Sequence, residues 1–374
     1  MNDIQKPGFF KKPGFFLDNE PHPDYRCEKA VNTVGETYRA GIGENIALIV
    51  IAFIFLGCFI HLWSAPVRQL LRARGLRLLR AGNRLLRDRD FGGAIAKYTE
   101  SIAKHPSLVE AYLGRSSAYI EMGDTEKAFS DCNRVIELDD RNHSAYLNRG
   151  SVHRINQEHE QSVADFSQCI KLQPDCAEAR FNRGYVLMEL DRYDGALEDL
   201  SNVILLNPSD AHAHYYRARI YYKNNRFNEV AVDLSNAIDL GLKSAVTYKF
   251  RAHANSQTGE FEKALSDYKS ALQHAPDDAE ALNGLAWFLA TCPIPHLRDG
   301  ARAVEAATRS CELYKYAEWF CVGTLAAAFA ETNRFDEAIN WAAKSLQLAP
   351  DEEKQACSER LKLYESNQPY RIPH

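Results

Sequence analysis

Hydrophobic residues follow two different patterns along this chain, and each pattern predicts a different kind of helix. No Asp, Glu, Lys or Arg occurs between Glu44 and Arg68, and Ile46 to Trp63 form one apolar run, IALIVIAFIFLGCFIHLW. As a helix, such a run covers roughly 27 Å, close to the hydrocarbon thickness of a bilayer. A core helix of a repeat protein would be apolar on one side only, whereas this run is apolar all round. The pattern therefore predicts one transmembrane helix at residues 45–67.

The residues on either side of this run differ in charge. Residues 1–44 contain Pro, Gly, Asn and charged residues without a helical period, and they are predicted to be a flexible tail. Positive charge is in excess after the run, where six arginines follow closely: Arg68, Arg72, Arg74, Arg77, Arg80 and Arg84. Because positive residues collect on the cytoplasmic side of a membrane helix, the segment that follows is predicted to be cytoplasmic.

Beyond the apolar run, the same residue types recur at a fixed period of 34. Arginines have this constant spacing at Arg115, Arg149, Arg183, Arg217 and Arg251. Aspartates have the same spacing at Asp131, Asp165, Asp199, Asp233 and Asp267. Pro174 and Pro208 also differ by one period, and Pro106 and Pro276 lie two periods away. Three series with one period predict a tandem repeat, placed at residues 68–350.

Each period has the composition of two helices joined by a turn. Small residues recur where paired helices must approach closely, as at Gly150 and Gly184. Turn-forming residues separate the paired helices, as in Thr258-Gly259-Glu260. The proline near the end of each unit cannot continue a helix. Because one helical pair cannot bury its apolar face alone, the units are predicted to stack.

These residues resemble the tetratricopeptide-repeat (TPR) family. One unit has the family's aromatic, small and proline residues at Tyr248, Ala252, Phe261, Ala264, Tyr268, Ala271 and Pro276. The resemblance implies an all-α, right-handed α-solenoid of about eight helix-turn-helix units, with residues 351–374 as a capping helix and tail. Six extra residues, 292–297, are expected between the helices of the seventh unit. The run GLAWFLATCP resembles a variant common in bacterial proteins, which favours a bacterial inner membrane as the location.

Charge and cysteine content narrow the classes of function. The formal net charge is −5 and the pI is about 6.2, so nothing points to nucleic acid as a partner. The nine cysteines are odd in number and include no Cys-x-x-Cys, which argues against a zinc ribbon or a redox-active pair. They are interpreted as free thiols in a reducing compartment.

The arginine and aspartate series are predicted to be structural. Each arginine lies on a first helix, and an aspartate follows it at a constant offset on the second. A helical hairpin would bring the two positions together, so ion pairs that fix the packing register are expected in each of five units. Semi-exposed pairs of this kind contribute roughly 0–1 kcal/mol each.

A different face of the first helices is predicted to bind a partner. The resemblance implies that these helices line a concave groove, at positions displaced from the packing positions. In the units at residues 177–210, 211–244 and 245–278, such positions are aromatic and basic: Tyr185, Tyr215, Arg219, Tyr222, Lys249 and His253. Such a groove suits an extended peptide with aromatic and acidic residues. The alternative interpretation is a solvated helix face.

The sequence contains no nucleotide-binding, hydrolase or metalloprotease motif, and no enzyme activity, cofactor or metal is predicted. Chaperone-tail binding is not predicted either, because Lys249 is followed by His253 where that family pattern has Asn. The leading hypothesis is a membrane-tethered scaffold or adaptor that binds a protein or peptide. The alternatives are a self-assembling structural solenoid that organises a membrane complex, with homo-oligomerisation left open, and an accessory subunit of a membrane enzyme.

Overall fold

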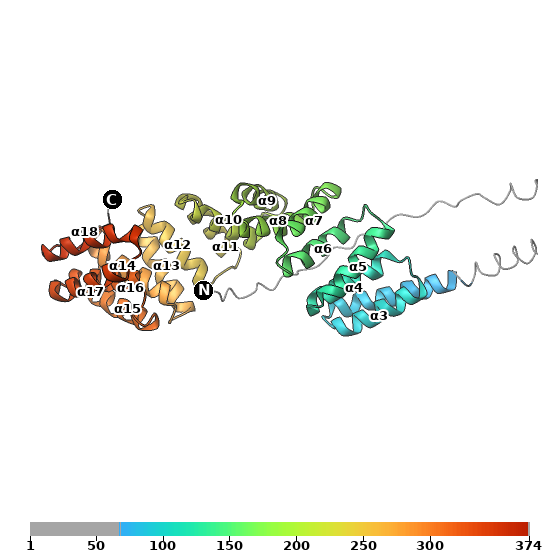
Figure 1. Ribbon diagram of the computed structural model, residues 1–374, viewed down its shortest axis with the longest axis horizontal. Helices are drawn as coiled ribbons and strands as arrows, with labels where there is room; N and C mark the ends of the chain where they lie inside the picture. Colours follow the sequence, from blue (N-terminus) through green and yellow to red (C-terminus); the bar gives the residue numbers. More distant parts are fainter. Residues whose placement is uncertain (1–66, 68, 373–374) are drawn as a thin grey trace, which may run out of the picture. The chain divides into compact units, whose positions relative to one another are not determined.

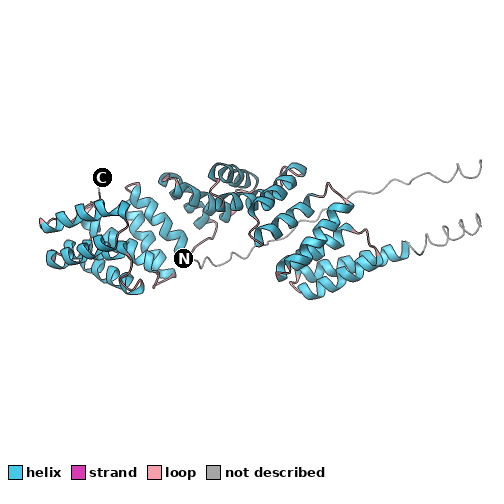
Figure 2. Ribbon diagram, in the orientation of Figure 1, coloured by secondary structure: helices cyan, strands magenta, loops and turns pink. Residues whose placement is uncertain are grey.

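The computed structural model describes residues 67 and 69–372. Throughout this range the chain is helical, without a strand, and short loops join the helices (Figure 2). A helix at residues 69–87 comes first, and α3 to α18 follow it (Figure 1). The chain divides into two compact units, one ending at Gln157 and the other beginning at Glu158.

The first compact unit is built around one tyrosine. Its helices are those at residues 69–87, α3 (Phe91–Lys104), α4 (Val109–Met122), α5 (Thr125–Leu138) and α6 (His143–Ile155). The ring of Tyr98 is fully buried, and Gly82 and Gly114 leave the space that it fills. Its hydroxyl donates to Asn83 Oδ1 at 2.8 Å, so the buried phenol keeps a hydrogen-bond partner.

The second compact unit contains the remaining helices. They are α7 (His159–Leu172), α8 (Ala177–Glu189), α9 (Tyr193–Leu206), α10 (Ala211–Lys223), α11 (Phe227–Asp239), α12 (Ala245–Gln257), α13 (Phe261–His274), α14 (Ala279–Thr291), α15 (Gly300–Leu313), α16 (Trp319–Glu331), α17 (Phe335–Leu348) and α18 (Lys354–Glu365). Two short 3-10 helices join them, η2 (Pro295–Leu297) and η3 (Asp351–Glu353). The largest core cluster runs from α12 to α18 and includes Phe288, Leu325 and Tyr364.

The turns inside the helical pairs share one backbone conformation. Gly123, Asn225 and Gly259 have φ of 78°, 54° and 78°, the left-handed region that ends a helix. Whole numbers of the repeat period separate these positions, so the turn repeats with the helices. Glycine adopts this conformation without strain, which explains its presence at two of the three positions.

Side-chain caps mark the start of several first helices. Asn142, Asp210, Ser244 and Asp278 each accept a hydrogen bond from a backbone N–H in the first turn of α6, α10, α12 and α14, respectively. Whole numbers of the repeat period separate these residues as well. The caps satisfy N–H groups that have no partner within the helix, and so they fix where each first helix begins.

The predicted all-helical repeat array is confirmed for the described residues. In sequence order the described helices form eight pairs followed by α18, and η2 occupies the predicted insertion between α14 and α15. The handedness of the array stays a prediction. No helix among residues 67 and 69–372 is long and apolar enough to cross a membrane. The predicted transmembrane helix and tail lie outside the described residues, apart from Val67.

Candidate functional site

The arginine and aspartate series forms bidentate ion pairs between the two helices of a repeat unit. Arg183 donates through Nε and Nη2 to the two carboxylate oxygens of Asp199, at 2.7 and 2.8 Å. The same geometry joins Arg115 to Asp131, Arg217 to Asp233 and Arg251 to Asp267. The hydrogen bonds to these carboxylates raise the pKa of Arg115, Arg183 and Arg217. The remaining two series members, Arg149 and Asp165, lie in different compact units.

The pairs are more buried than the expected semi-exposed ones. The side chain of Asp199 is 1 % exposed and that of Arg183 is 22 % exposed. Each arginine also uses Nη1 to reach a polar side chain on the second helix of the preceding unit. These acceptors form a series of their own: Thr99, Asn133, Ser167, Ser201 and Ser235. The four arginines with a paired aspartate, Arg115, Arg183, Arg217 and Arg251, therefore each join neighbouring second helices, and this face of the array is structural.

The predicted groove residues of α8 and α10 gather around a buried tyrosine. The ring of Tyr216 lies 5.3 Å from both Tyr185 and Tyr215, edge to face. The guanidinium of Arg219 lies 5.7 Å from the centroid of the same ring. Burial raises the pKa of Tyr215 and raises that of Tyr216 to about 12, so both hydroxyls stay protonated at neutral pH.

Three of the predicted residues, Tyr215, Arg219 and Tyr222, line one hollow between α10, α11 and α12. The other lining residues are Ala218, Val230, Leu234 and Phe250. The hollow is shallow and closely packed, because it leaves no space that a water molecule could occupy. It is therefore an apolar surface on which a ligand side chain can pack, and not a pre-formed pocket.

Arg219 is the charged group at this hollow. Among the described residues no carboxylate forms an ion pair with it, in contrast to Arg217 two residues earlier. A guanidinium with free donors beside aromatic rings can bind a carboxylate in a two-pronged manner while the rings hold an apolar neighbour. The arrangement can therefore bind an anion and a hydrophobic side chain together.

Lys249 contributes less free positive charge than the sequence implied. Its ammonium lies 3.1 Å from Asp278 and 2.6 Å from Glu280, both at the start of α14. The Lys249 side chain is only 16 % exposed. Two carboxylates thus neutralise this lysine, and Arg219 remains the basic group available to a ligand.

His253 belongs to the aromatic cluster and is not a basic groove residue. Its ring centroid lies 5.3 Å from Tyr222 and 5.6 Å from Phe227. Burial lowers the pKa of His253, so the ring is neutral at pH 7. Its Nδ1 is buried without a hydrogen-bond partner among the described residues. Tyr222 packs in addition against Phe250, at 4.9 Å.

Sequence reasoning missed the walls of this site. Val230 and Leu234 come from α11, a second helix, whereas the prediction considered first helices alone. Phe250 directly follows Lys249, and its large apolar side chain could have indicated an apolar surface at this position. Asp278 and Glu280 were missed because they belong to the next unit, far from Lys249 along the chain.

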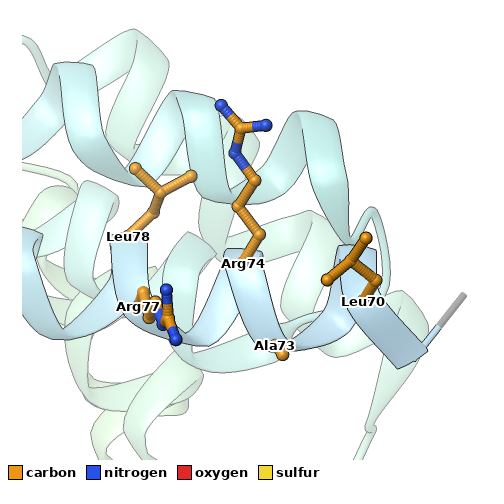
Figure 3. Close-up of a pocket in the computed structure, with 5 residues that line it drawn as sticks. All are labelled: Leu70, Ala73, Arg74, Arg77 and Leu78. Atoms are coloured by element: carbon orange, nitrogen blue, oxygen red, sulfur yellow. The ribbon is translucent and has the colours of Figure 1, made fainter. Parts of the chain in front are cut away.

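A second hollow, of about 500 Å³, lies along the helix at residues 69–87 (Figure 3). All five lining residues come from that one helix: Leu70, Ala73, Arg74, Arg77 and Leu78. No other described element closes it. It therefore lacks the convergent polar groups of a built site.

Comparison with known proteins places most of the described chain in one class of repeat. Two family models described as tetratricopeptide repeat match residues 79–143 with 147–202, and residues 209–354. A third, described as TPR repeat, matches residues 184–225.

Individual relatives are similar over short stretches. The chain is 31 % identical over 64 residues to sperm-associated antigen 1 of Rattus norvegicus, covering 17 % of this chain and 7 % of that protein. It is 40 % identical over 58 residues to the protein SGT1 homolog of Oryza sativa subsp. japonica, covering 16 % of each. The structure of pilF from Pseudomonas aeruginosa matches with a TM-score of 0.52 at 15 % identity, over 57 % of this chain and 96 % of that one. The chain thus spans under a fifth of both curated relatives, and the pilF likeness supports the fold alone.

Proposed function

Because residues 79–354 are an array of tetratricopeptide repeats, we propose that the chain is a non-catalytic scaffold that binds a partner protein or peptide. The binding face is the groove side of the first helices α8, α10 and α12. The observation that carries this proposal is the unpaired Arg219 at the edge of an aromatic hollow. Arginine and tyrosine side chains in one pocket are frequent anchors of protein interfaces.

The ligand chemistry follows from the two parts of this site. One apolar or aromatic side chain of the ligand packs on the surface that Tyr215, Tyr222 and Phe250 form. Arg219 binds a carboxylate, from Asp, from Glu or from a chain end. Because Lys249 already pairs with Asp278 and Glu280, a long acidic run gains little from it. The preferred ligand is a short segment with an apolar residue next to one acidic group.

Membrane tethering forms the second part of the proposal. The apolar run at residues 46–63 would anchor the chain in a membrane, with the repeats on the cytoplasmic side of a bacterial inner membrane. The excess of arginine after the run supports this orientation. An alkaline phosphatase fused after residue 374 should be inactive, and a green fluorescent protein fused there should fluoresce. The opposite pair of results would reverse the orientation.

The binding part is tested by selecting peptides from a randomised dodecapeptide library displayed on phage. The target is the full chain in lipid nanodiscs, with counter-selection against the chain carrying Tyr215→Ala and Arg219→Ala. Selected peptides should share an apolar residue beside an acidic one. They should also bind the Lys223→Ala chain normally, because Lys223 is an exposed basic residue at the end of the same helix.

Two results would contradict the proposal. Peptides that bind the counter-selected variant equally well would move the site away from Arg219. An empty selection together with concentration-dependent self-association would instead favour the self-assembling structural solenoid.

A further inference from the structure

The segment that follows α18 turns back onto the repeats. Asn367 has a φ of 54°, and the N–H groups of Asn367 and Gln368 donate to carbonyls in the last turn of α18. Residues 365–368 are exposed, whereas residues 369–372 are half-buried although they belong to no helix. The turn at Asn367 therefore directs four residues onto another surface of the same unit.

That surface is the end of α14. The ring of Tyr370 lies 5.6 Å from the ring of Trp287. Arg371 donates through Nη1 to the carbonyl of Ala290 at 3.1 Å, and Ile372 donates its backbone N–H to the carbonyl of Thr291 at 3.0 Å. The segment thus presents an aromatic ring, a guanidinium and a main-chain donor to one helix end.

The chemistry of α14 explains why this end accepts donors. The carbonyl of Thr291 cannot form the usual helical bond to the residue four positions on, because Pro295 has no N–H. The carbonyls of Cys292 and Pro293 accept from Arg298. A helix end also carries partial negative charge, which favours a cation. The extra residues of this unit therefore create acceptors for a ligand that donates.

A carboxylate completes the site. Glu331, at the end of α16, lies 2.5 Å from Nη2 of Arg371, and its other oxygen lies 2.9 Å from Nε of Arg298. The Glu331 side chain is 14 % exposed, and that of Arg298 is 17 % exposed. The guanidinium of Arg360 from α18 lies 5.5 Å from the centroid of the Trp287 ring. Tyr370 and Arg371 thus contact α14 and α16, and Tyr370 shares the Trp287 ring with a residue of α18.

The site corresponds in register to the groove of the earlier repeats. Trp287 lies one repeat period after His253, which itself lies one period after Arg219. The three residues therefore occupy one position on three successive first helices. Tyr370 therefore contacts α14 at the repeat position that Arg219 occupies on α10.

We propose that the ends of α14 and α16 form a second peptide-binding site, selective for an extended partner segment in which an arginine follows an aromatic residue. Residues 369–372 are its internal ligand and must leave before a partner segment binds. The site has the opposite charge preference to the hollow at Arg219, because its fixed groups are backbone carbonyls and the carboxylate of Glu331. The two sites would therefore bind different segments.

The test uses the full chain and a fluorescent, terminally blocked peptide of residues 367–372, followed by fluorescence polarisation. Replacing Tyr370 and Arg371 with alanine in the chain empties the site, so the peptide should bind this variant about tenfold more tightly than the unmodified chain. The exposed Lys362→Ala chain is the matched control and should resemble the unmodified chain.

Two further variants locate the site. Adding Glu331→Gln to the emptied chain should remove the gain in affinity. A peptide with Arg371→Gln should likewise show no gain in affinity on the emptied chain. Because both peptides are measured on the same protein, misfolding cannot account for the result. Equal binding to the emptied and unmodified chains would overturn the proposal, as would a gain that survives both substitutions.

Discussion

Replacing Asp199 with asparagine tests whether the buried ion pairs hold the repeats in register. Asp199 is 1 % exposed, and it accepts from Nε and Nη2 of Arg183, with Arg180 Nη1 at 3.4 Å. Asparagine has the same size, but one acceptor oxygen becomes an amide that donates. At least one arginine N–H then faces another donor, and the negative charge is lost.

The expected loss of stability follows from this geometry. Removing one partner of a buried pair costs about 3–5 kcal/mol. Arg183 and Arg180 are 22 % and 17 % exposed, so water solvates part of each guanidinium, and the lower end of the range applies. We expect a loss of about 3 kcal/mol, or roughly 100-fold in the unfolding equilibrium.

Urea-induced unfolding followed by circular dichroism measures this loss. The matched control is Asp194→Asn, the same change at an exposed position of the same helix α9, which should stay within about 0.5 kcal/mol. A loss below about 1 kcal/mol at Asp199, indistinguishable from the control, would refute the structural role of the series.

Two further predictions concern the core and the aromatic cluster. Gly114→Ala places a methyl group 2.5 Å from the buried Tyr98 ring and should cost about 1–3 kcal/mol in thermal or urea unfolding, whereas Gly92→Ala meets no close atom and should cost nothing. Because burial lowers the pKa of His253, the unfolded chain binds this proton more readily. The stability that depends on neutral His253 is therefore full above the unfolded pKa of about 6.5 and is lost as the pH falls through the folded value. His253→Phe should reduce the difference in stability between pH 7.5 and pH 5.5, while the exposed His212→Phe should leave it unchanged.

The repeat and the contacts within it could be predicted from the sequence, because both depend on residue spacing alone. The constant offset between Arg217 and Asp233 follows from any hairpin of two packed helices, so it predicts a contact without further information. The acceptor series that includes Ser201 has the same period, so its contacts with the arginines could also have been predicted from spacing. Spacing also predicted the position of η2, because the insertion departs from the period by six residues.

Contacts between non-equivalent residues were not accessible in this way. The position of Lys249 in the repeat predicts a basic groove residue. In the structure, however, the start of α14 brings Asp278 and Glu280 beside it. The contact of Arg371 with Glu331 depends on how α14 ends, and that end is peculiar to one unit. A period describes what the repeats share, whereas binding sites arise where a repeat differs from its neighbours.

The central claim, that Arg219 binds a carboxylate of a peptide ligand, is tested most directly by a double-mutant cycle. A selected peptide and its acid-to-amide form are each titrated against the unmodified and Arg219→Gln chains by calorimetry. Hydrogen bonds to charged groups contribute about 1.5–3 kcal/mol, so the two changes should couple by at least about 1.5 kcal/mol, or roughly tenfold in affinity. Losses that simply add, with no coupling, would show that the carboxylate does not contact Arg219 and would contradict the proposed site.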